Sequence, residues 1–197
     1  MTPEEIRAKI EVAHKFGACV DLRGVICEGL LVLDGAKLTG VDFTGAQFPQ
    51  GISAVGAEFM GVSWFHEISA PYLDFRDALF HNDARFDRAQ VAARADFSGA
   101  ELRGVSQFDS ARIEGDLSLS GVNGYGNCSL ENAVVGGTLA LGGSEWFGGL
   151  WLENTRLSGL AADDMQVHGR LWLKRARLGN EPVPEDRFNI RFGYSYL

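Results

Sequence analysis

Large apolar residues recur along the chain at a spacing that is too short for helices. Within residues 95–122, Phe97, Phe108 and Leu119 follow one another at intervals of 11. A small residue stands two places before most large ones, and a glycine stands two places after several of them. This combination, repeated every five or six residues, predicts a solenoid in which each short face contributes one large side chain to the core.

Two interleaved ladders extend this pattern over most of the chain. The first ladder consists of Trp64, Phe75, Phe86, Phe97, Phe108, Leu119, Leu130, Leu141 and Leu152. The second consists of Phe80, Val91, Leu102, Ile113, Gly124, Val135, Trp146 and Leu157. Alternate rungs of the second ladder differ in character, because one half is branched aliphatic and the other is variable and partly aromatic. One full coil is therefore predicted to contain 22 residues and four faces, with equivalent residues of stacked coils about 4.8 Å apart.

The five-residue units within these ladders resemble the pentapeptide repeat. The units are AKLTG at 36–40, AEFMG at 57–61, ARFDR at 84–88, ADFSG at 95–99, AELRG at 100–104 and ARIEG at 111–115. The resemblance covers about residues 20–180 and implies an all-β fold, a right-handed four-sided β-helix whose central Leu or Phe and preceding Ala point inward. Two departures are visible, since the chain mostly inserts one residue per two pentads, and from 115 onward the units change to forms such as GDLSLSG and GTLALGG.

Residues 1–19 are predicted to cap the first coil. Thr2, Pro3 and Glu5 form a helix start, with Thr at the N-cap, Pro at the first helical position and Glu at the third. A helix over residues 3–16 would cover the open edge of the solenoid, which otherwise invites association with other chains.

The solenoid body is predicted to run over residues 20–180 with two irregular stretches. Residues 66–72 blur the pattern and contain Pro71, which lacks a backbone donor, so a bulge or a small outward loop is expected there. Asp163 falls where a large apolar residue is due, and the register returns one residue early after it.

Residues 181–197 are predicted to form an exit loop and then a terminal strand. From 187 onward, apolar and polar residues alternate strictly, which is typical of a half-buried strand. The strand could cap the last coil, or it could pair with a second copy of the chain to give a homodimer. The sequence does not decide between these two arrangements.

Composition and charge limit the cellular compartment and the classes of partner that we expect. The chain has 197 residues, 46% of them hydrophobic, and a formal net charge of -8. That charge argues against direct binding of nucleic acid phosphates. The three cysteines form no CxxC pair, and Cys128 falls at a small inward position, so a buried free thiol and a reducing compartment are expected. No apolar run is long enough to span a bilayer and no leader opens the chain, which predicts a cytoplasmic protein without membrane contact.

A search for catalytic chemistry yields one crowded stretch. His66 and Glu67 lie about one pair of faces before His81 and Asp83, and the four could form a metal or acid–base site if they met. The alternative is that all four point outward into solvent, and we favour it. No phosphate loop, calcium loop or nucleophile motif is present. We therefore predict no catalytic residue, no metal and no cofactor.

The candidate binding residues lie on one outer face. Glu131 and Glu153 each follow an inward leucine and are 22 apart, and Asp109 precedes them by the same interval, so the three should form one acidic column. Like charges stacked in this way repel one another, which is unfavourable unless a cation or a basic partner binds them. Trp151 and Trp172 are 21 apart and should stack on an outer face, either as a protein contact or beneath the C-terminal strand. Phe65 and Tyr125 are further aromatics expected to point outward.

Two classes of function remain. The resemblance includes the branch of the family that inhibits topoisomerases and confers quinolone resistance, whose members are acidic rods that imitate duplex DNA and bind DNA gyrase. It also includes scaffolds and interaction modules with unassigned partners. Either class predicts a protein-binding solenoid rather than an enzyme. The sequence does not discriminate between gyrase and another protein partner.

Overall fold

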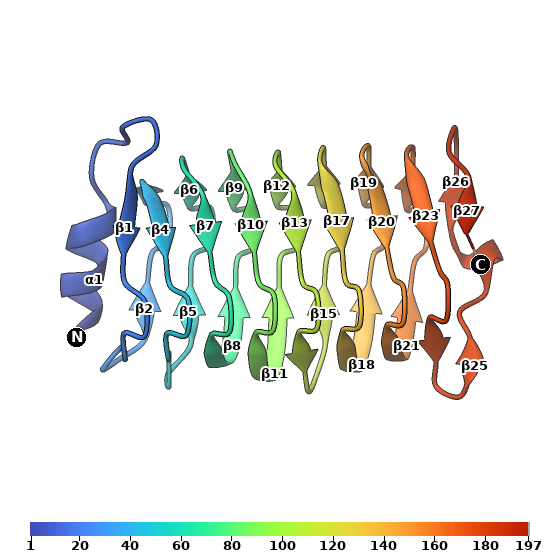
Figure 1. The fold of residues 1–197 in the computed structure, drawn as a ribbon, viewed down its shortest axis with the longest axis horizontal. Helices are drawn as coiled ribbons and strands as arrows, with labels where there is room; N and C mark the ends of the chain where they lie inside the picture. The colour runs from blue at the N-terminus through green and yellow to red at the C-terminus, as the bar shows by residue number, and fades with distance from the viewer. Residues whose placement is uncertain (197) are drawn as a thin grey trace.

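The chain winds into stacked coils of short parallel strands. The computed structural model describes residues 1–196. Its strands form three sheets, and all pairings within the body are parallel (Figure 1). The first sheet contains β1 (Cys19–Asp21), β4 (Gly40–Asp42), β7 (Ser63–Trp64), β10 (Ala84–Arg85), β13 (Ser106–Gln107), β17 (Asn127–Ser129), β20 (Gly149–Trp151), β23 (Arg170–Trp172) and β27 (Ser195–Tyr196). We call this surface side 1.

The second sheet folds around a corner and supplies two sides. β11 pairs with β14 through its first residues and with β15 through its last. The sheet contains β2 (Leu31–Val32), β5 (Ile52–Ser53), β8 (Ser69–Asp74), β11 (Gln90–Asp96), β14 (Arg112–Ile113), β15 (Leu117–Ser118), β18 (Val134–Ala140), β21 (Arg156–Ala161), β24 (Arg177–Leu178) and β25 (Glu181–Pro182). We call the part around β14 side 2 and the part around β15 side 3.

The third sheet closes each coil as side 4. It contains β3 (Lys37–Leu38), β6 (Glu58–Phe59), β9 (Leu79–Phe80), β12 (Glu101–Leu102), β16 (Asn123–Gly124), β19 (Glu145–Trp146), β22 (Gln166–Val167) and β26 (Asn189–Ile190). Partners in neighbouring coils are 21 or 22 residues apart through the body, as in the pairs Glu58↔Leu79 and Ala84↔Ser106. The predicted four-sided β-helix is confirmed, and only the last turn is longer, since Leu171 pairs with Ser195.

The core consists of stacked phenylalanines in the first half of the solenoid and mainly aliphatic residues in the second. Phe97 and Phe108 are buried, as predicted. Rings from successive coils lie face to face, with centroids 5.1 Å apart for Phe75 and Phe97 and 5.2 Å apart for Phe86 and Phe108. Rings from adjoining sides meet edge to face, which is the other favourable aromatic geometry.

One rung of the predicted ladder is displaced by a residue. Phe65, not Trp64, points into the core, and its ring stacks on Phe86 with centroids 4.7 Å apart. The step between these coils is 21 residues rather than 22, because Ser63 pairs with Ala84. The prediction that Phe65 points outward and Trp64 inward is therefore wrong, and the shorter coil is the reason.

The N-terminal helix is shorter than predicted. α1 spans Pro3–Ile10 and begins with the expected capping box, in which the Thr2 hydroxyl accepts from the Glu5 amide. Ile6 and Ile10 are fully buried, and the helix lies across the first coil (Figure 1). It ends at Ile10 instead of residue 16, because Ile10 is its last apolar contact and the residues that follow are exposed.

The two irregular stretches have different outcomes. Residues 66–72 form no outward loop, since β8 runs continuously across the corner between sides 2 and 3; the extra residue lies opposite, in β11 between Val91 and Arg94. The early return of the register is confirmed, because Glu145 pairs with Gln166 after a coil of 21 residues.

The C-terminal segment is not one strand. β25 turns back antiparallel to β24, a short 3-10 helix η1 (Glu185–Arg187) follows, and β26 and β27 then extend sides 4 and 1. The alternation therefore spans a corner, and Phe192 at that corner is 83% exposed. Leu197 lies outside the described residues. No helix among residues 1–196 is long and apolar enough to cross a membrane.

Candidate protein-binding surface

Four carboxylates occupy equivalent positions in consecutive coils, in the turns that directly follow the side-1 strands. Asp109, Glu131 and Glu153 form the predicted column, and Asp87 precedes them in the coil before. Backbone bonds fix this alignment, since the Ser110 amide donates to the Glu131 carbonyl at 2.7 Å, and equivalent bonds join the coils on either side. Each carboxylate directly follows a buried ladder residue and so points outward. We call Asp87, Asp109, Glu131 and Glu153 the acidic column.

Side chains of the chain itself lie against both ends of the acidic column, an imidazole at one end and two cationic groups at the other. His66 Nδ1 lies 3.1 Å from an Asp87 carboxylate oxygen. At the other end, Arg175 Nη2 donates to Glu153 at 2.9 Å and Lys174 Nζ lies 3.5 Å from the same oxygen. The terminal members of the column are therefore already partnered.

The two middle carboxylates have no basic partner among residues 1–196. Asp109 accepts hydrogen bonds from the Glu131 amide at 3.0 Å and from the Ser129 hydroxyl. Glu131 accepts a long 3.4 Å bond from the Asn132 side chain. Neither forms an ion pair in the described part of the chain, so two adjacent negative charges remain on this face. These two carboxylates are the part of the acidic column that a basic partner could bind.

Asp87 is the member of the acidic column whose ionised form the folded protein disfavours. Its side chain is only 17% exposed. Burial raises the pKa of its carboxyl above the usual value; the neighbouring His66 opposes this change and the charge of Asp109 adds to it. A carboxyl with a raised pKa binds its proton more tightly in the folded protein than in the unfolded chain.

We expect Asp87→Asn to be at least as stable as the native protein at neutral pH. Because the native pKa is raised, ionisation of Asp87 opposes folding, and its cost appears as the pH rises from the usual carboxyl value through the raised one. The advantage of the amide should therefore vanish in acid, where both states are protonated. Denaturant unfolding between about pH 3 and pH 7 measures this. The exposed Asp164→Asn is the control, and a variant that is less stable at neutral pH would show instead that the contact with His66 outweighs burial.

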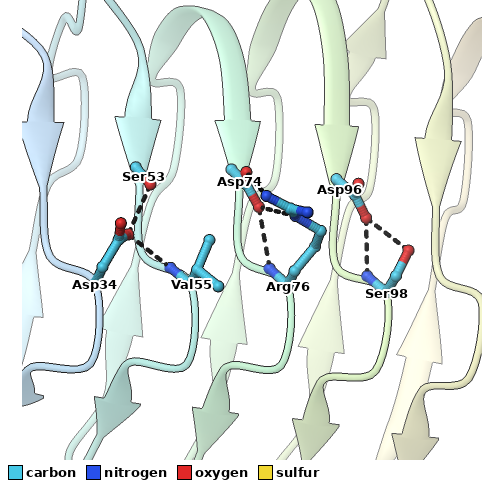
Figure 2. Close-up of polar contacts among 7 residues, drawn as sticks. All are labelled: Asp34, Ser53, Val55, Asp74, Arg76, Asp96 and Ser98. Carbon is cyan, nitrogen blue, oxygen red and sulfur yellow. Dashed lines mark hydrogen bonds and ion pairs between the residues drawn. The ribbon is translucent and has the colours of Figure 1, made fainter.

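Carboxylates on side 3 serve the fold, as the hydrogen bonds of Asp109 also do. Figure 2 shows that Asp34, Asp74 and Asp96 each bind a backbone amide at the adjoining corner. Asp34 reaches the Val55 amide of the next coil at 2.9 Å, and Asp74 also pairs with the Arg76 guanidinium at 2.8 Å. These side chains join coils and close turns, so much of the net negative charge is not free for a partner.

Trp151 and Trp172 of side 1 differ in their surroundings. Trp151 and Trp172 are paired in register in adjacent strands and both are half-buried, as the 21-residue spacing predicts. The ring of Tyr196 lies over Trp172 with centroids 4.0 Å apart. The C-terminal strand therefore covers Trp172, one of the two predicted alternatives, while Trp151 lies one coil further from it.

The histidine cluster does not assemble. His81 Nδ1 lies 3.0 Å from an Arg103 nitrogen, Glu67 pairs with Arg88, and the Asp83 carboxylate accepts from the Val105 amide. Together with His66 beside Asp87, each member of the proposed site has a partner elsewhere. No group of three or more His, Cys, Asp or Glu within residues 1–196 is placed to hold a metal ion.

A second outer column was missed by sequence reasoning. Tyr125, Phe147, His168 and Phe192 stack at the corner between sides 4 and 1, with successive ring centroids 5.2, 4.8 and 6.0 Å apart. We call these four residues the aromatic ladder. The spacings of 22 and 21 residues between its first three members carry the signal in the sequence. Tyr125 was predicted to point outward, and it is 50% exposed.

Comparison with known proteins finds a likeness among solved structures. No family model and no curated protein matches the chain. A solved structure that is similar is HetL, a pentapeptide repeat protein involved in heterocyst differentiation regulation from the cyanobacterium Nostoc sp. strain PCC 7120. The two are 13% identical, and the match covers 97% of this chain and 90% of HetL with a TM-score of 0.26. The assignment of the fold rests on the coil geometry of the chain itself.

Proposed function

We propose that this chain, a pentapeptide-repeat solenoid, acts by presenting side 1 to a protein partner rather than by catalysis. The observation that carries the proposal is the pair Asp109 and Glu131, adjacent in the acidic column and without a basic partner among residues 1–196. Trp151 lies beside the column, and Trp172 lies beneath Tyr196. Aromatic residues and unpaired charges on one rigid face are what a recognition surface requires.

Charge favours a basic partner for this surface. Two carboxylates in adjacent coils, about 4.8 Å apart along the solenoid, repel each other, and the repulsion is relieved when lysine or arginine side chains approach. Such complementarity raises the rate of encounter and makes binding sensitive to salt.

The specific partner that we propose is DNA gyrase or a related topoisomerase. An acidic rod can occupy a basic saddle built for duplex DNA, and a protein that does so would imitate DNA and alter the response to antibiotics that act on the enzyme. The alternative is a scaffold for another protein. Arg170, Lys174, Arg175 and Arg177 favour this alternative, because a basic last coil does not resemble DNA. A homodimer through the C-terminal strand also stays a prediction.

The proposed compartment is a reducing cytoplasm. Cys19, Cys27 and Cys128 are all free, and Cys128 is fully buried next to the acidic column, where burial raises the pKa of its thiol. Buried thiols of this kind are unreactive and need no oxidising environment.

A gyrase supercoiling assay with purified protein tests the specific partner. We expect the native protein to inhibit supercoiling, and the triple variant Asp109→Asn, Glu131→Gln, Glu153→Gln to need at least about tenfold more protein, the effect of losing roughly 1.4 kcal/mol of binding. The matched control is Asp163→Asn, Asp164→Asn, Glu181→Gln, which removes the same charge from exposed positions outside the acidic column. Equal loss in both triple variants would reject the column as the site, and no inhibition by the native protein would reject gyrase in favour of the scaffold.

A further inference from the structure

The aromatic ladder lies beside a strip of bare backbone. Tyr125, Phe147 and His168 are each followed by a glycine, namely Gly126, Gly148 and Gly169, and Gly149 adds another at the start of β20. We call these four glycines the glycine strip. On its far side lies the column that contains Ser129, Trp151 and Trp172, paired in register across side 1. The corner is at the top of the ribbon in Figure 1, between the side-4 strands and the side-1 strands.

Close packing of the coils explains why the strip carries no side chains. A Cβ atom added to Gly148 would stand 2.8 Å from the Asn127 nitrogen, and one added to Gly169 would stand 2.9 Å from the Gly149 nitrogen. Since the obstacle is backbone in each case, it cannot move aside. The consequence is a rigid strip between two columns that carry aromatic side chains, in which Gly126, Gly148 and Gly169 are partly exposed and Gly149 is buried.

The exposed ring surface at this corner is unusual for a protein surface without a partner. Tyr125 is 50% exposed, Phe147 is 42% exposed and Phe192 is 83% exposed. Phe192 extends the ladder into the last coil, where Arg170 lies over the ring of Tyr194. A contiguous set of exposed rings on a rigid frame marks an interaction site.

The side-1 sheet already uses part of the backbone at the glycine strip. Gly149 pairs in register with Asn127 in the coil before it and with Arg170 in the coil after it. An extended partner strand laid along the strip would leave its own backbone groups unpaired. Polyproline II avoids this cost, because it has no internal or ladder hydrogen bonds and proline has no N–H.

We propose that the aromatic ladder and the glycine strip bind a proline-rich segment of a partner protein in the polyproline II conformation. One turn of that helix advances about 9.3 Å in three residues, and two coils of the solenoid advance about 9.6 Å. Every third residue of the segment therefore meets every second ring of the ladder. Proline-rich segments in the polyproline II conformation usually bind in grooves lined by aromatic side chains.

Charge on the two flanks selects a basic segment. Glu145 lies on side 4 next to the ladder and is 40% exposed at its side chain, with a carboxylate oxygen 3.5 Å from His168 Nε2. Glu131 lies on the opposite flank, beyond Ser129, without a basic partner in the described chain. A lysine or arginine beside the prolines can reach either carboxylate, whereas an acidic segment would be repelled. This inference rests on the proposed protein-binding function and names the chemistry of the partner.

The test is direct binding of a synthetic peptide to the full chain. The probe is a labelled ten-residue peptide with eight prolines between two arginines, followed by fluorescence anisotropy. A peptide of alternating glycine and serine between the same arginines has the same length and charge. We expect saturable binding of the proline peptide and at least about tenfold weaker binding of the glycine–serine peptide. Equal affinity for both peptides would overturn the proposal.

Variants of the chain locate the site. Phe147→Ser removes an exposed ring from the ladder and should weaken binding at least about tenfold, a loss of roughly 1.4 kcal/mol. Phe16→Ser is the matched control, since Phe16 is fully exposed in the segment after α1 and should leave affinity unchanged. Asn127→Arg, which fills the exposed strip with a positive side chain, should abolish binding without altering the core. Unchanged affinity in Phe147→Ser and Asn127→Arg would overturn the site.

Two further results separate this inference from the function on which it rests. Efficient competition by single-stranded oligothymidylate would show that the rings stack on bases and would overturn the proline proposal. If neither peptide binds while a basic protein still binds through the acidic column, the proline proposal fails and the proposed function stands. If the proline peptide binds and the acidic triple variant binds basic proteins as the native protein does, the proline proposal stands and the acidic column is not the recognition surface.

Discussion

Replacing Phe86 by alanine is expected to lower the free energy of unfolding by about 3–5 kcal/mol. Phe86 stacks face to face on Phe65 and Phe108, in the coils on either side, with centroids 4.7 and 5.2 Å away. It also meets Phe75 and Phe97 edge to face. The rigid coils cannot close around the cavity, because their spacing is fixed by backbone bonds on every side.

Denaturant unfolding monitored by circular dichroism measures this change. Phe192→Ala is the matched control, because Phe192 is 83% exposed and its loss should change stability by no more than about 0.5 kcal/mol. A loss below about 1 kcal/mol in Phe86→Ala would contradict the stacked core, since that is less than the transfer of a buried ring alone.

Gly124→Ala is expected to destabilise the protein by up to about 3 kcal/mol through overpacking. A Cβ atom at Gly124 would stand 2.6 Å from Cζ3 of Trp146, which occupies the equivalent position one coil later. Trp146 is fully buried, and its indole N–H donates to the Ser144 hydroxyl at 2.9 Å, so the ring is fixed in place. The glycine therefore provides the space for the largest core side chain.

A double-mutant cycle tests this arrangement. Trp146→Leu alone should destabilise by removing ring surface, but Gly124→Ala should cost much less in the Trp146→Leu background. The free energies of unfolding of the four proteins give the coupling between the two positions. Additive effects would contradict the packing of Trp146 over Gly124.

The core residues of this fold can be predicted from the sequence, because each coil of the solenoid repeats the pattern of the coil before. Each buried ladder residue, such as Phe97, has an equivalent in the next coil, so one error of register is corrected by its neighbours. The step from Phe65 to Phe86 was mispredicted because the coil there has 21 residues. Two adjacent aromatics, Trp64 and Phe65, were then candidates for one inward position. Only the pairing of Ser63 with Ala84 distinguishes them.

The outer surface was less predictable, for a physical reason. The alignment of Asp109, Glu131 and Glu153 follows from the coil length alone, and the structure reproduces it. Whether each carboxylate is free depends on long side chains from other coils, such as Arg175 beside Glu153. Spacing along the chain does not specify those contacts. The aromatic ladder is a different case, since its spacing is present in the sequence, yet the predicted outward aromatics included Tyr125 without Phe147 or His168.

The C-terminal segment was wrongly predicted to be one strand, because apolar and polar residues also alternate across a corner. From Phe188 to Tyr196 the pattern suits one half-buried strand, yet the chain turns between β26 and β27 and leaves Phe192 outside. A corner and a strand both expose every second residue over a short stretch, and hydrophobic periodicity does not separate them.

The most direct measurement of the central claim is the affinity of the purified protein for the DNA-binding core of gyrase as a function of salt. We predict that the dissociation constant rises steeply with ionic strength, and that the triple variant Asp109→Asn, Glu131→Gln, Glu153→Gln raises it at least about tenfold, while Asp163→Asn, Asp164→Asn, Glu181→Gln changes it much less. Binding that ignores both salt and the substitutions in the acidic column, or an absence of binding at any salt concentration, would contradict the proposal that this acidic face recognises gyrase.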